Sequence, residues 1–364
     1  MVIIKKIICM FMPVILPFFK RISKMDLKEA RKHLECYSRK PLGEAIAENN
    51  LREPICDLQI IVPAYNVEKY IENCMESILS QKTKYTYKVI LIDDGSTDKT
   101  STIVDRFLSN DNVMVIHQEN SGFSGARNVG LENLFGKYIM FVDSDDMLCQ
   151  GAIDALLDAA FLNDSDIVEG GAFSMIDGTN QKSVYFAHLK KKCLSTAFGT
   201  LHGQPWAKVY KAECFKNICF PEGFWFEDSI LSFLIYPVKK RICVVDEFIY
   251  IYRLNPGGIS STFKNKPKAI DTYWITEMLM GSLQKSNIDV SNIFFEKYLN
   301  QLILNQKRLQ AAPLYIQEST FVLSVQMMNS YFPDHMINSK RHKKLVKALL
   351  ENDLGAYRFY CKCC

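Results

Sequence analysis

The chain has 364 residues, of which 48% are hydrophobic and 23% charged, and its net charge is +4 at pH 7. These values are typical of a soluble globular protein and exclude a disordered chain, a collagen and a small disulfide-stapled protein. No run of 18 apolar residues occurs, which excludes a spanning helix on length. The 12 cysteines are scattered without CxxC or zinc-like spacing, which predicts reduced thiols in a cytosolic protein.

The start of the chain is basic and apolar. Residues 1–32 hold eight Lys or Arg against two acidic residues, and residues 7–19 are apolar with two prolines. This run is too short to cross a bilayer, and it ends in Lys20-Arg21 rather than in a small-residue cleavage site. We expect an anchor on a membrane surface, to which each cation adds about 1 kcal/mol. The alternative is a segment docked on the protein's own surface.

From residue 57 on, strand-like and helix-like segments alternate. Short β-branched runs predict strands at 58–62, 88–92, 113–116 and 138–142. Helical spacing of apolar residues predicts helices at 67–81, around 103–108 and at 124–135, with Ser96 as the cap of the second helix. This alternation indicates a mostly parallel sheet that is covered by helices on both faces.

Polar residues follow three of these predicted strands. They are Tyr65-Asn66, Asp93-Asp94 and the acidic run from Asp143 to Asp146. In open α/β sheets ligands bind at the carboxyl ends of the strands, so we expect these groups to converge on one site. Any one of them alone is also compatible with an ordinary turn.

The acidic run predicts a cation site. Asp143, Asp145 and Asp146 lie within four residues, and their mutual repulsion is relieved when a cation binds. Carboxylate oxygens suit Mg²⁺ or Mn²⁺, whereas the alternative is a solvated acidic turn. Residues 120–128 add glycines and the cation Arg127, which suits a diphosphate or a pyranose. No GxGxxG or P-loop motif is present.

The motifs together resemble the family 2 glycosyltransferases. They are PAYN at 63–66, DDGSTD at 93–98, NSGFSGARN at 120–128, FVDSDD at 141–146 and FEDS at 226–229. The resemblance covers about residues 57–260 and is strongest to bacterial enzymes of capsule, exopolysaccharide and O-antigen assembly. It implies the α/β GT-A fold, which is a Rossmann-like, mostly parallel sheet flanked by helices. It also implies a nucleotide-diphosphate sugar donor, Mn²⁺ or Mg²⁺ as the cofactor, and inversion at the anomeric carbon.

The resemblance also assigns roles to residues on the donor side. Tyr65 would stack on the nucleobase, Asp94 would bind the base edge, and Arg127 would neutralise phosphate or brace the site. The full implied donor set is Pro63, Ala64, Tyr65, Asn66, Asp94, Ser96, Gly122, Arg127, Asn128 and Ser144. The implied metal ligands are Asp143, Asp145 and Asp146, and their spacing leaves open which of them touches the ion.

On the acceptor side, Glu227-Asp228 matches the family's ED motif. By that resemblance Asp228 is the catalytic base and Glu227 orients it, because inversion needs a carboxylate beside the incoming hydroxyl. The alternative is an acidic pair favoured at a helix start. Trp206 would stack on an acceptor sugar, and Lys208 would reach the donor or brace a loop. Tyr252-Arg253 and the segment 257–261 resemble a loop beside the diphosphate.

The chain divides into three predicted parts. Residues 1–55 form a basic, partly helical extension, residues 56–262 the GT-A domain, and residues 263–364 a helical region with helices at 268–284, 291–309 and 315–330. Residues 26–50 also read as helical. The basic stretch 340–347 predicts a surface helix, with a membrane-facing helix as the alternative.

These features predict a metal-dependent hexosyltransferase. It would move a sugar from a donor, expected to be UDP-linked, to a hydroxyl of a glycan, expected to be polyprenyl-linked, at the cytoplasmic face of the cell membrane. No nucleic acid partner is expected. The alternatives are a carbohydrate-binding scaffold on a transferase fold and a sugar-phosphate nucleotidyltransferase. Donor sugar, acceptor and linkage do not follow from the sequence, because variable loops set the shape of the pocket. The oligomeric state does not follow from the sequence either.

Overall fold

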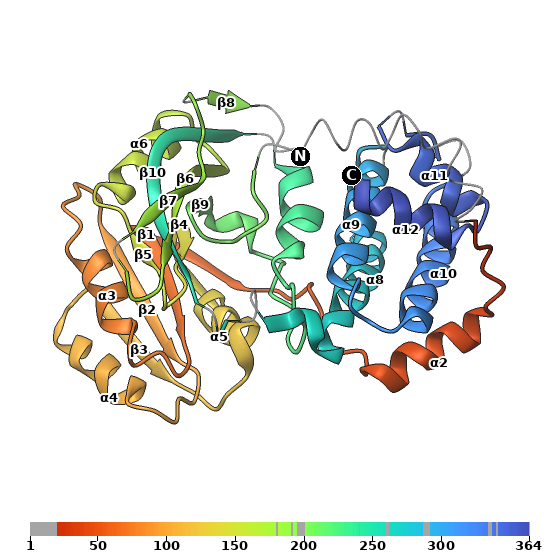
Figure 1. The fold of residues 1–364 in the computed structure, drawn as a ribbon. Helices are drawn as coiled ribbons and strands as arrows, with labels where there is room; N and C mark the ends of the chain where they lie inside the picture. The colour runs from red at the N-terminus through yellow and green to blue at the C-terminus, as the bar shows by residue number, and fades with distance from the viewer. Residues whose placement is uncertain are drawn as a thin grey trace. The chain divides into compact units, whose positions relative to one another are not determined.

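The computed structural model describes residues 20–179, 181–190, 192–194, 201–239, 241–255, 257–258, 262–286, 292–333, 337–339 and 341–363. The predicted anchor at 7–19 lies outside these residues. The chain forms two compact units (Figure 1). One unit is residues 42–258, and the other combines residues 1–41 with residues 259–364.

A single mixed sheet forms the centre of the first unit, in the order β3-β2-β1-β4-β9-β6-β10-β5. Its first four strands are parallel. They are β1 (Asn50–Ala64), β2 (Tyr87–Asp93), β3 (Val113–His117) and β4 (Asn133–Phe141). The antiparallel strand β9 joins β4 to β6, and β6 pairs in parallel with β10. The remaining strands are β5 (Met147–Leu148), β6 (Ile167–Ile176), β7 (Lys182–Phe186), β8 (Lys192–Leu194), β9 (Lys208–Lys211) and β10 (Ile242–Leu254).

Helices cover both faces of the parallel strands. Leu58, Ile60 and Val62 of β1 share a core with helices α3, α4 and α6. The alternate β1 residues Gln59 and Ile61 contact α5, which lies on the other side of the sheet (Figure 1). Burial on both faces is what a parallel sheet requires. These helices are α3 (Ile71–Leu79), α4 (Thr100–Asp105), α5 (Gly122–Leu131) and α6 (Ala152–Leu162).

The structure confirms the predicted strands and corrects two details. The helix predicted at 124–135 ends at Leu131, because Asn133 already begins β4. Ser96 does not cap the second helix, since α4 begins only at Thr100. Short 3-10 segments complete the order at Arg106–Ser109, Ala212–Cys214, Tyr236–Val238, Phe263–Asn265 and Pro267–Ile270, with a π-helical turn, η4, at Leu231–Ile235.

A disulfide joins Cys193 of β8 to Cys243 of β10. The prediction that the cysteines are reduced thiols is therefore wrong for this pair. The sequence offered no signal for it, because the two residues are 50 positions apart and become neighbours only when β8 pairs with β10.

The second unit is helical. Its helices are α2 (Leu27–Tyr37), α8 (Asp271–Lys285), α9 (Asn292–Arg308), α10 (Leu314–Tyr331), α11 (Lys343–Leu350) and α12 (Leu354–Cys363). The predicted C-terminal helices are confirmed within a few residues, but of residues 26–50 only 27–37 are helical. Arg31 and Lys40 pair with Glu277 of α8 at 2.5 and 2.7 Å.

Helix α11 exposes its cations and buries its apolar face. Lys343, Lys344 and Lys347 are exposed, whereas Leu345 and Leu349 are buried. This pattern is that of a surface helix. Among the described residues, no helix has the length and apolar content needed to cross a bilayer.

Gln59 holds the junction between α5 and β4, where only Glu132 separates helix from strand. Its amide nitrogen donates to the carbonyl oxygens of Gly130 (2.8 Å) and Asn133 (3.2 Å). Its amide oxygen accepts from the backbone N–H groups of Phe135 (3.0 Å) and Gly136 (3.1 Å). The side chain is fully buried and therefore replaces water for four backbone groups.

Replacing this amide should be costly. We expect Gln59→Leu to lower the free energy of unfolding by about 3 kcal/mol, because buried backbone groups lose their partners. Urea denaturation measures the change. The control Gln150→Leu, at an exposed side chain, should shift stability by less than about 0.5 kcal/mol. Equal stability of the two variants would contradict the assigned role of Gln59.

Candidate active site

The polar residues predicted to converge do follow neighbouring strands at one edge of the sheet. Ala64 at the end of β1 is in register with Asp93 at the end of β2, and Asp94 N donates to Ala64 O at 2.8 Å. On the other side of β1, Ile61 is in register with Phe141, and Val142 N donates to Ile61 O at 3.1 Å. The acidic run after β4 and the residues after β1 and β2 therefore share this edge.

Asp94 organises the loop that leads into α5. Its Oδ1 accepts hydrogen bonds from Gln118 Nε2 (2.7 Å), Ser121 N (2.8 Å) and Ser121 Oγ (3.1 Å). The side chain is buried, with 2% of the residue exposed. These bonds place the start of α5 beside the end of β2, and at that start the φ of Gly122 is +77° with open space where a Cβ would lie. A ligand can therefore approach the backbone closely there.

Tyr65 stands at this edge as an exposed aromatic ring, 47% exposed. The next residue, Asn66, has a left-handed backbone with φ +51°. Its Oδ1 accepts from Thr97 N at 2.8 Å, and its N–H donates to Ser96 Oγ at 3.1 Å. Asn66 and Ser96 thus brace the turn that presents Tyr65, while Pro63 and Ala64 are buried at the end of β1.

The three aspartates after β4 differ in burial. Asp146 is 1% exposed, whereas Asp143 and Asp145 are half-buried, and the intervening Ser144 is buried. Burial and the neighbouring Asp145 and Asp143 raise the pKa of Asp146 well above its ordinary value. Burial and the charge of Asp143 raise the pKa of Asp145 to about 6. Such crowding destabilises the ionised forms.

This donor set fits a hard cation. Asp146 Oδ1 accepts from Arg253 N at 2.7 Å, but the buried Oδ2 has no hydrogen-bond partner in the described part of the chain. An unpartnered buried carboxylate oxygen costs free energy unless a donor or a metal meets it. Oxygen ligands of this kind are those that Mg²⁺ and Mn²⁺ prefer.

Arg253 clamps the acidic loop from the side of β10. Its Nε donates to Asp145 O at 2.7 Å, and its guanidinium pairs with Asp177 at 3.3 Å. The guanidinium also lies over the ring of Tyr70 at 4.9 Å, and Tyr70 Oη donates to Asp177 at 3.0 Å. The sequence analysis missed Asp177 and Tyr70, because neither stands in a motif.

Arg127 joins the acidic loop to the Glu-Asp pair. One guanidinium nitrogen lies 2.7 Å from Asp143 Oδ1 and another 2.6 Å from Glu227 Oε1. Its guanidinium carbon lies 5.8 Å and 5.3 Å from the ring centres of Phe123 and Phe220. Although burial opposes it, the two carboxylates raise the pKa of Arg127, which stays charged. These ion pairs are those of a bracing residue, and phosphate neutralisation by Arg127 stays a prediction.

Glu227 and Asp228 sit on a sharp turn before the π-helical turn η4. Phe226 has a φ of +65°, an unusual value for a bulky residue, and the following peptides begin the helical turns. Glu227 is buried and engaged by Arg127, whereas Asp228 is half-buried. Asp143, Arg127 and Glu227 are therefore brought together, and Asp228 follows directly.

The predicted acceptor residues are buried. Trp206 is 3% exposed, and its ring stacks on Tyr250 with 4.6 Å between centroids. Lys208 is fully buried, pairs with Glu169 at 2.7 Å and donates to Gln204 O at 2.8 Å. Lys208 thus braces the loop, one of its two expected roles, and acceptor binding by both residues stays a prediction. Tyr185 beside Trp206 is 45% exposed and was missed.

The side chain of Asn128 binds the backbone of Phe220. Its Nδ2 donates to Phe220 O, and its Oδ1 accepts from Phe220 N, both at 2.8 Å. The residue therefore fixes the segment behind Arg127, and donor binding by Asn128 stays a prediction.

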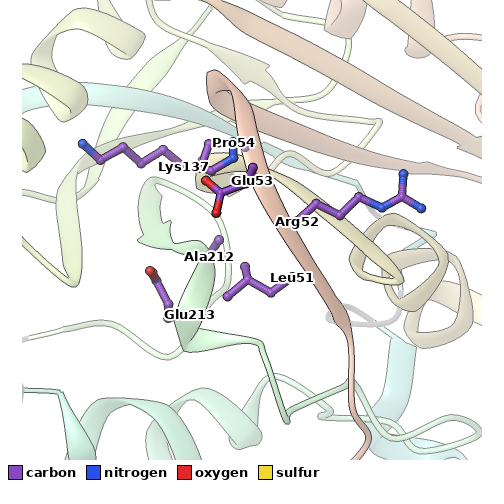
Figure 2. Close-up of a pocket in the computed structure, with 8 residues that line it drawn as sticks. Leu51, Arg52, Glu53, Pro54, Lys137, Ala212 and Glu213 are labelled. Carbon is purple, nitrogen blue, oxygen red and sulfur yellow. The ribbon is translucent and has the colours of Figure 1, made fainter.

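A shallow pocket of about 250 Å³ lies at the opposite end of the sheet (Figure 2). It is lined by the first half of β1, the start of β4 and the segment at Ala212-Glu213. Figure 2 shows the side chains of Arg52 and Lys137 pointing away in opposite directions. Its position at the amino-terminal part of β1 separates it from the aspartates.

Comparison with known proteins agrees with this geometry. The sequence profile described as Glycosyl transferase family 2 matches residues 59–217. Residues 59–217 form a family 2 glycosyltransferase domain. Among curated relatives, YibD of Escherichia coli is 38% identical over 59% of this chain and 66% of its own length. GlyA of Streptococcus pneumoniae is 31% identical over 57% and 32%, and EpsJ of Bacillus subtilis is 33% identical over 56% and 62%.

The GT-A fold of this chain is confirmed by solved structures. Residues 1–349 of TarS from S. aureus, in complex with UDP-GlcNAc, match with a TM-score of 0.64 at 20% identity, over 84% of this chain and 90% of that one. The chain spans only about a third of GlyA and under two thirds of EpsJ. The match to TarS shows the fold, and the part played by each residue rests on the contacts above.

The aspartates should make the stability of the metal-free protein depend on pH. The folded protein keeps protons on Asp145 and Asp146 above pH 4, where the unfolded chain releases them, so its free energy of unfolding should fall as pH rises through about 6. Urea denaturation at pH 5 and pH 8 should show a shallower fall for Asp146→Asn than for the parent protein.

The control Asp111→Asn, at an exposed position, should keep the parent pH dependence. Addition of Mn²⁺ at pH 8 should restore stability to the parent and to Asp111→Asn but not to Asp146→Asn. An identical pH dependence in all three proteins would refute the crowding of these aspartates.

Proposed function

We propose that this chain is an inverting glycosyltransferase that moves one sugar from a UDP-linked donor to a hydroxyl of a glycan. The observation that carries the proposal is the bridge from Arg127 to Asp143 and Glu227, at 2.7 and 2.6 Å. The bridge holds the acidic loop, which is suited to bind a cation, beside the Glu-Asp pair. Displacement at an anomeric carbon needs these two elements on either side of the sugar: charge stabilisation for the leaving diphosphate and a base for the acceptor.

The donor side is assigned to the edge formed by β1 and β2. The exposed ring of Tyr65 is suited to stack on uracil. The three hydrogen bonds described for the Asp94 carboxylate all fall on Oδ1, so we assign the contact with the base edge to Oδ2. The TarS structures, which hold UDP-GlcNAc or UDP, support a uridine nucleotide.

A divalent cation, Mn²⁺ or Mg²⁺, is assigned to Asp145 and Asp146, with the unpartnered Asp146 Oδ2 as one ligand atom. When bound, the ion would neutralise charge on the leaving diphosphate. Arg253 holds the loop through Asp145 O and Asp146 Oδ1, so the two carboxylates are positioned before the donor arrives. Asp143 is committed to Arg127, which makes it the least suitable ligand of the three.

The catalytic base is assigned to Asp228. The ion pair of Glu227 with the buried Arg127 favours a positioning role for Glu227 and leaves the role of base to its neighbour. Asp228 would accept the proton of the incoming hydroxyl as the new glycosidic bond forms.

The acceptor is proposed to be a lipid-linked glycan of a cell-surface polymer, met at the cytoplasmic face of the membrane. Relatives include the minor teichoic acid biosynthesis protein GgaA of B. subtilis, 30% identical over 76% of this chain and 64% of its own length. The exposed cations of α11 and the basic residues of the first 32 positions support contact with an anionic surface.

The function is tested by release of UDP from UDP-GlcNAc with Mn²⁺, with water as the acceptor. We expect turnover that EDTA abolishes, and Asp228→Asn should lower it at least about 100-fold, because a positioned base contributes that much. Binding of UDP, measured by calorimetry, should stay unchanged in this variant.

The control Asp246→Asn, at an exposed residue of β10, should keep full turnover. Normal turnover of Asp228→Asn would remove it as the base. If a panel of UDP-sugars bound without any release of UDP, the chain would be a binding protein rather than a transferase.

The stacking role of Tyr65 is tested by the affinity for UDP. Tyr65→Ala should weaken binding by about 1–3 kcal/mol, which is the worth of base–aromatic stacking, and Tyr65→Phe should bind like the parent. Titration calorimetry with Mn²⁺ present gives the dissociation constants. Equal affinity of the alanine and phenylalanine variants would place the base elsewhere.

A further inference from the structure

A second group of side chains of the types that bind metal ions lies apart from the aspartates. Glu169 of β6, His188 after β7 and His202 before β9, here called the Glu-His-His cluster, place one ligand atom each within 4.8 Å of one another. The three residues come from three separate segments, and folding brings them to one point. The cluster forms no motif in the sequence, because its first and last members are 33 positions apart.

Both imidazoles converge on the same carboxylate oxygen. Glu169 Oε2 lies 2.8 Å from His188 Nε2 and 3.2 Å from His202 Nδ1. The ring of His202 stacks on Phe186 with 3.7 Å between centroids, and the edge of His188 meets the same ring at 6.2 Å. Aromatic packing therefore fixes the two rings in an orientation that aims nitrogen atoms at one place.

Glu169 is an ionised ligand even though it is fully buried. Burial opposes its charge, but Lys208 at 2.7 Å from Oε1 and the two histidines hold the pKa of Glu169 well below its usual range. The backbone N–H of His202 also donates to Oε1 at 2.9 Å. Oε1 is thus held by hydrogen bonds from the protein, and Oε2 is the oxygen that both histidines contact. Metal-binding carboxylates are usually held by such hydrogen bonds from neighbouring groups.

The ligand types differ from those of the acidic loop. Two neutral imidazoles and one carboxylate are a three-ligand set for Zn²⁺, which leaves a fourth position for water. The aspartates of the other site offer oxygen alone, which suits Mg²⁺ or Mn²⁺. The His202 side chain is 38% exposed, so an ion can reach the cluster from solvent.

We propose that the Glu-His-His cluster is a zinc site, distinct from the aspartate site of the transferase. Zinc there would replace the hydrogen bonds from the histidines to Glu169 Oε2 and tie the segments after β7 and before β9 to strand β6. His202 stands four residues before Trp206 and six before Lys208, so the ion would fix the loop on the predicted acceptor side. The proposal does not depend on the donor, the acceptor or turnover.

The test is zinc binding to the whole chain, measured by competition with a chromophoric zinc indicator in metal-free buffer. The double variant His188→Gln/His202→Asn keeps an amide N–H donor near each position of the lost imidazole nitrogen, so the hydrogen bonds to Glu169 can persist while the ligand nitrogens are lost. We expect one zinc per parent chain and an affinity at least about tenfold weaker in the double variant.

Two further variants separate the sites. His33→Gln, at a histidine of the helical unit that bonds Ser319, and Asp145→Asn, at the acidic loop, should both bind zinc as the parent does. Zinc should also raise the melting temperature of the parent but not that of the double variant. Equal zinc affinity in the parent and the double variant, or no binding to the parent at 100 μM zinc, would overturn the proposal.

Discussion

The site depends on one buried cation shared between two carboxylates. Arg127 contacts Asp143 after β4 and Glu227 before η4, two segments separated by more than 80 residues. The buried carboxylate of Glu227 is unstable without a counter-charge, and the buried guanidinium is equally unstable without its two partners. The fork geometry of arginine lets a single side chain serve both partners. The cation that neutralises the charges therefore also fixes the spacing between the two halves of the site.

The parallel half of the sheet could be predicted from the sequence because its signals are local. The runs at 58–62, 88–92 and 138–142 are β-branched and end in polar residues, and the register of parallel strands brings those ends together. The connection from α5 to β4 could not be predicted, since the apolar residues after Leu131 fit a helix as well as a strand. The helix ends there because Gln59, more than 70 positions away, binds the backbone of the junction.

The predicted site residues separate into those with an open ring or an unpartnered atom and those that hold other residues. Tyr65 is exposed and Asp146 keeps an unpartnered oxygen in the described structure, as ligand-binding groups do. The polar atoms of the second group instead form hydrogen bonds with the backbone or ion pairs with carboxylates. This group is Asn66, Asn128, Arg127 and Lys208. A sequence motif contains residues of both groups and does not distinguish them, because the geometry of the site needs both. The burial of Trp206 and the clamp through Asp177 depend on tertiary contacts that the sequence does not display.

The direct passage from α5 into β4 has a further consequence for how such a protein can diversify. Arg127 lies on α5 and Asp143 lies just past the far end of β4, so the helix and the strand act as a single stiff arm between them. An added residue in this passage would turn α5, and Arg127 with it, relative to β4. If the extra residue shifted the strand instead, every side chain of β4 would move to the opposite face of the sheet. Chain length between β7 and β9, by contrast, can vary without adding a residue to this passage.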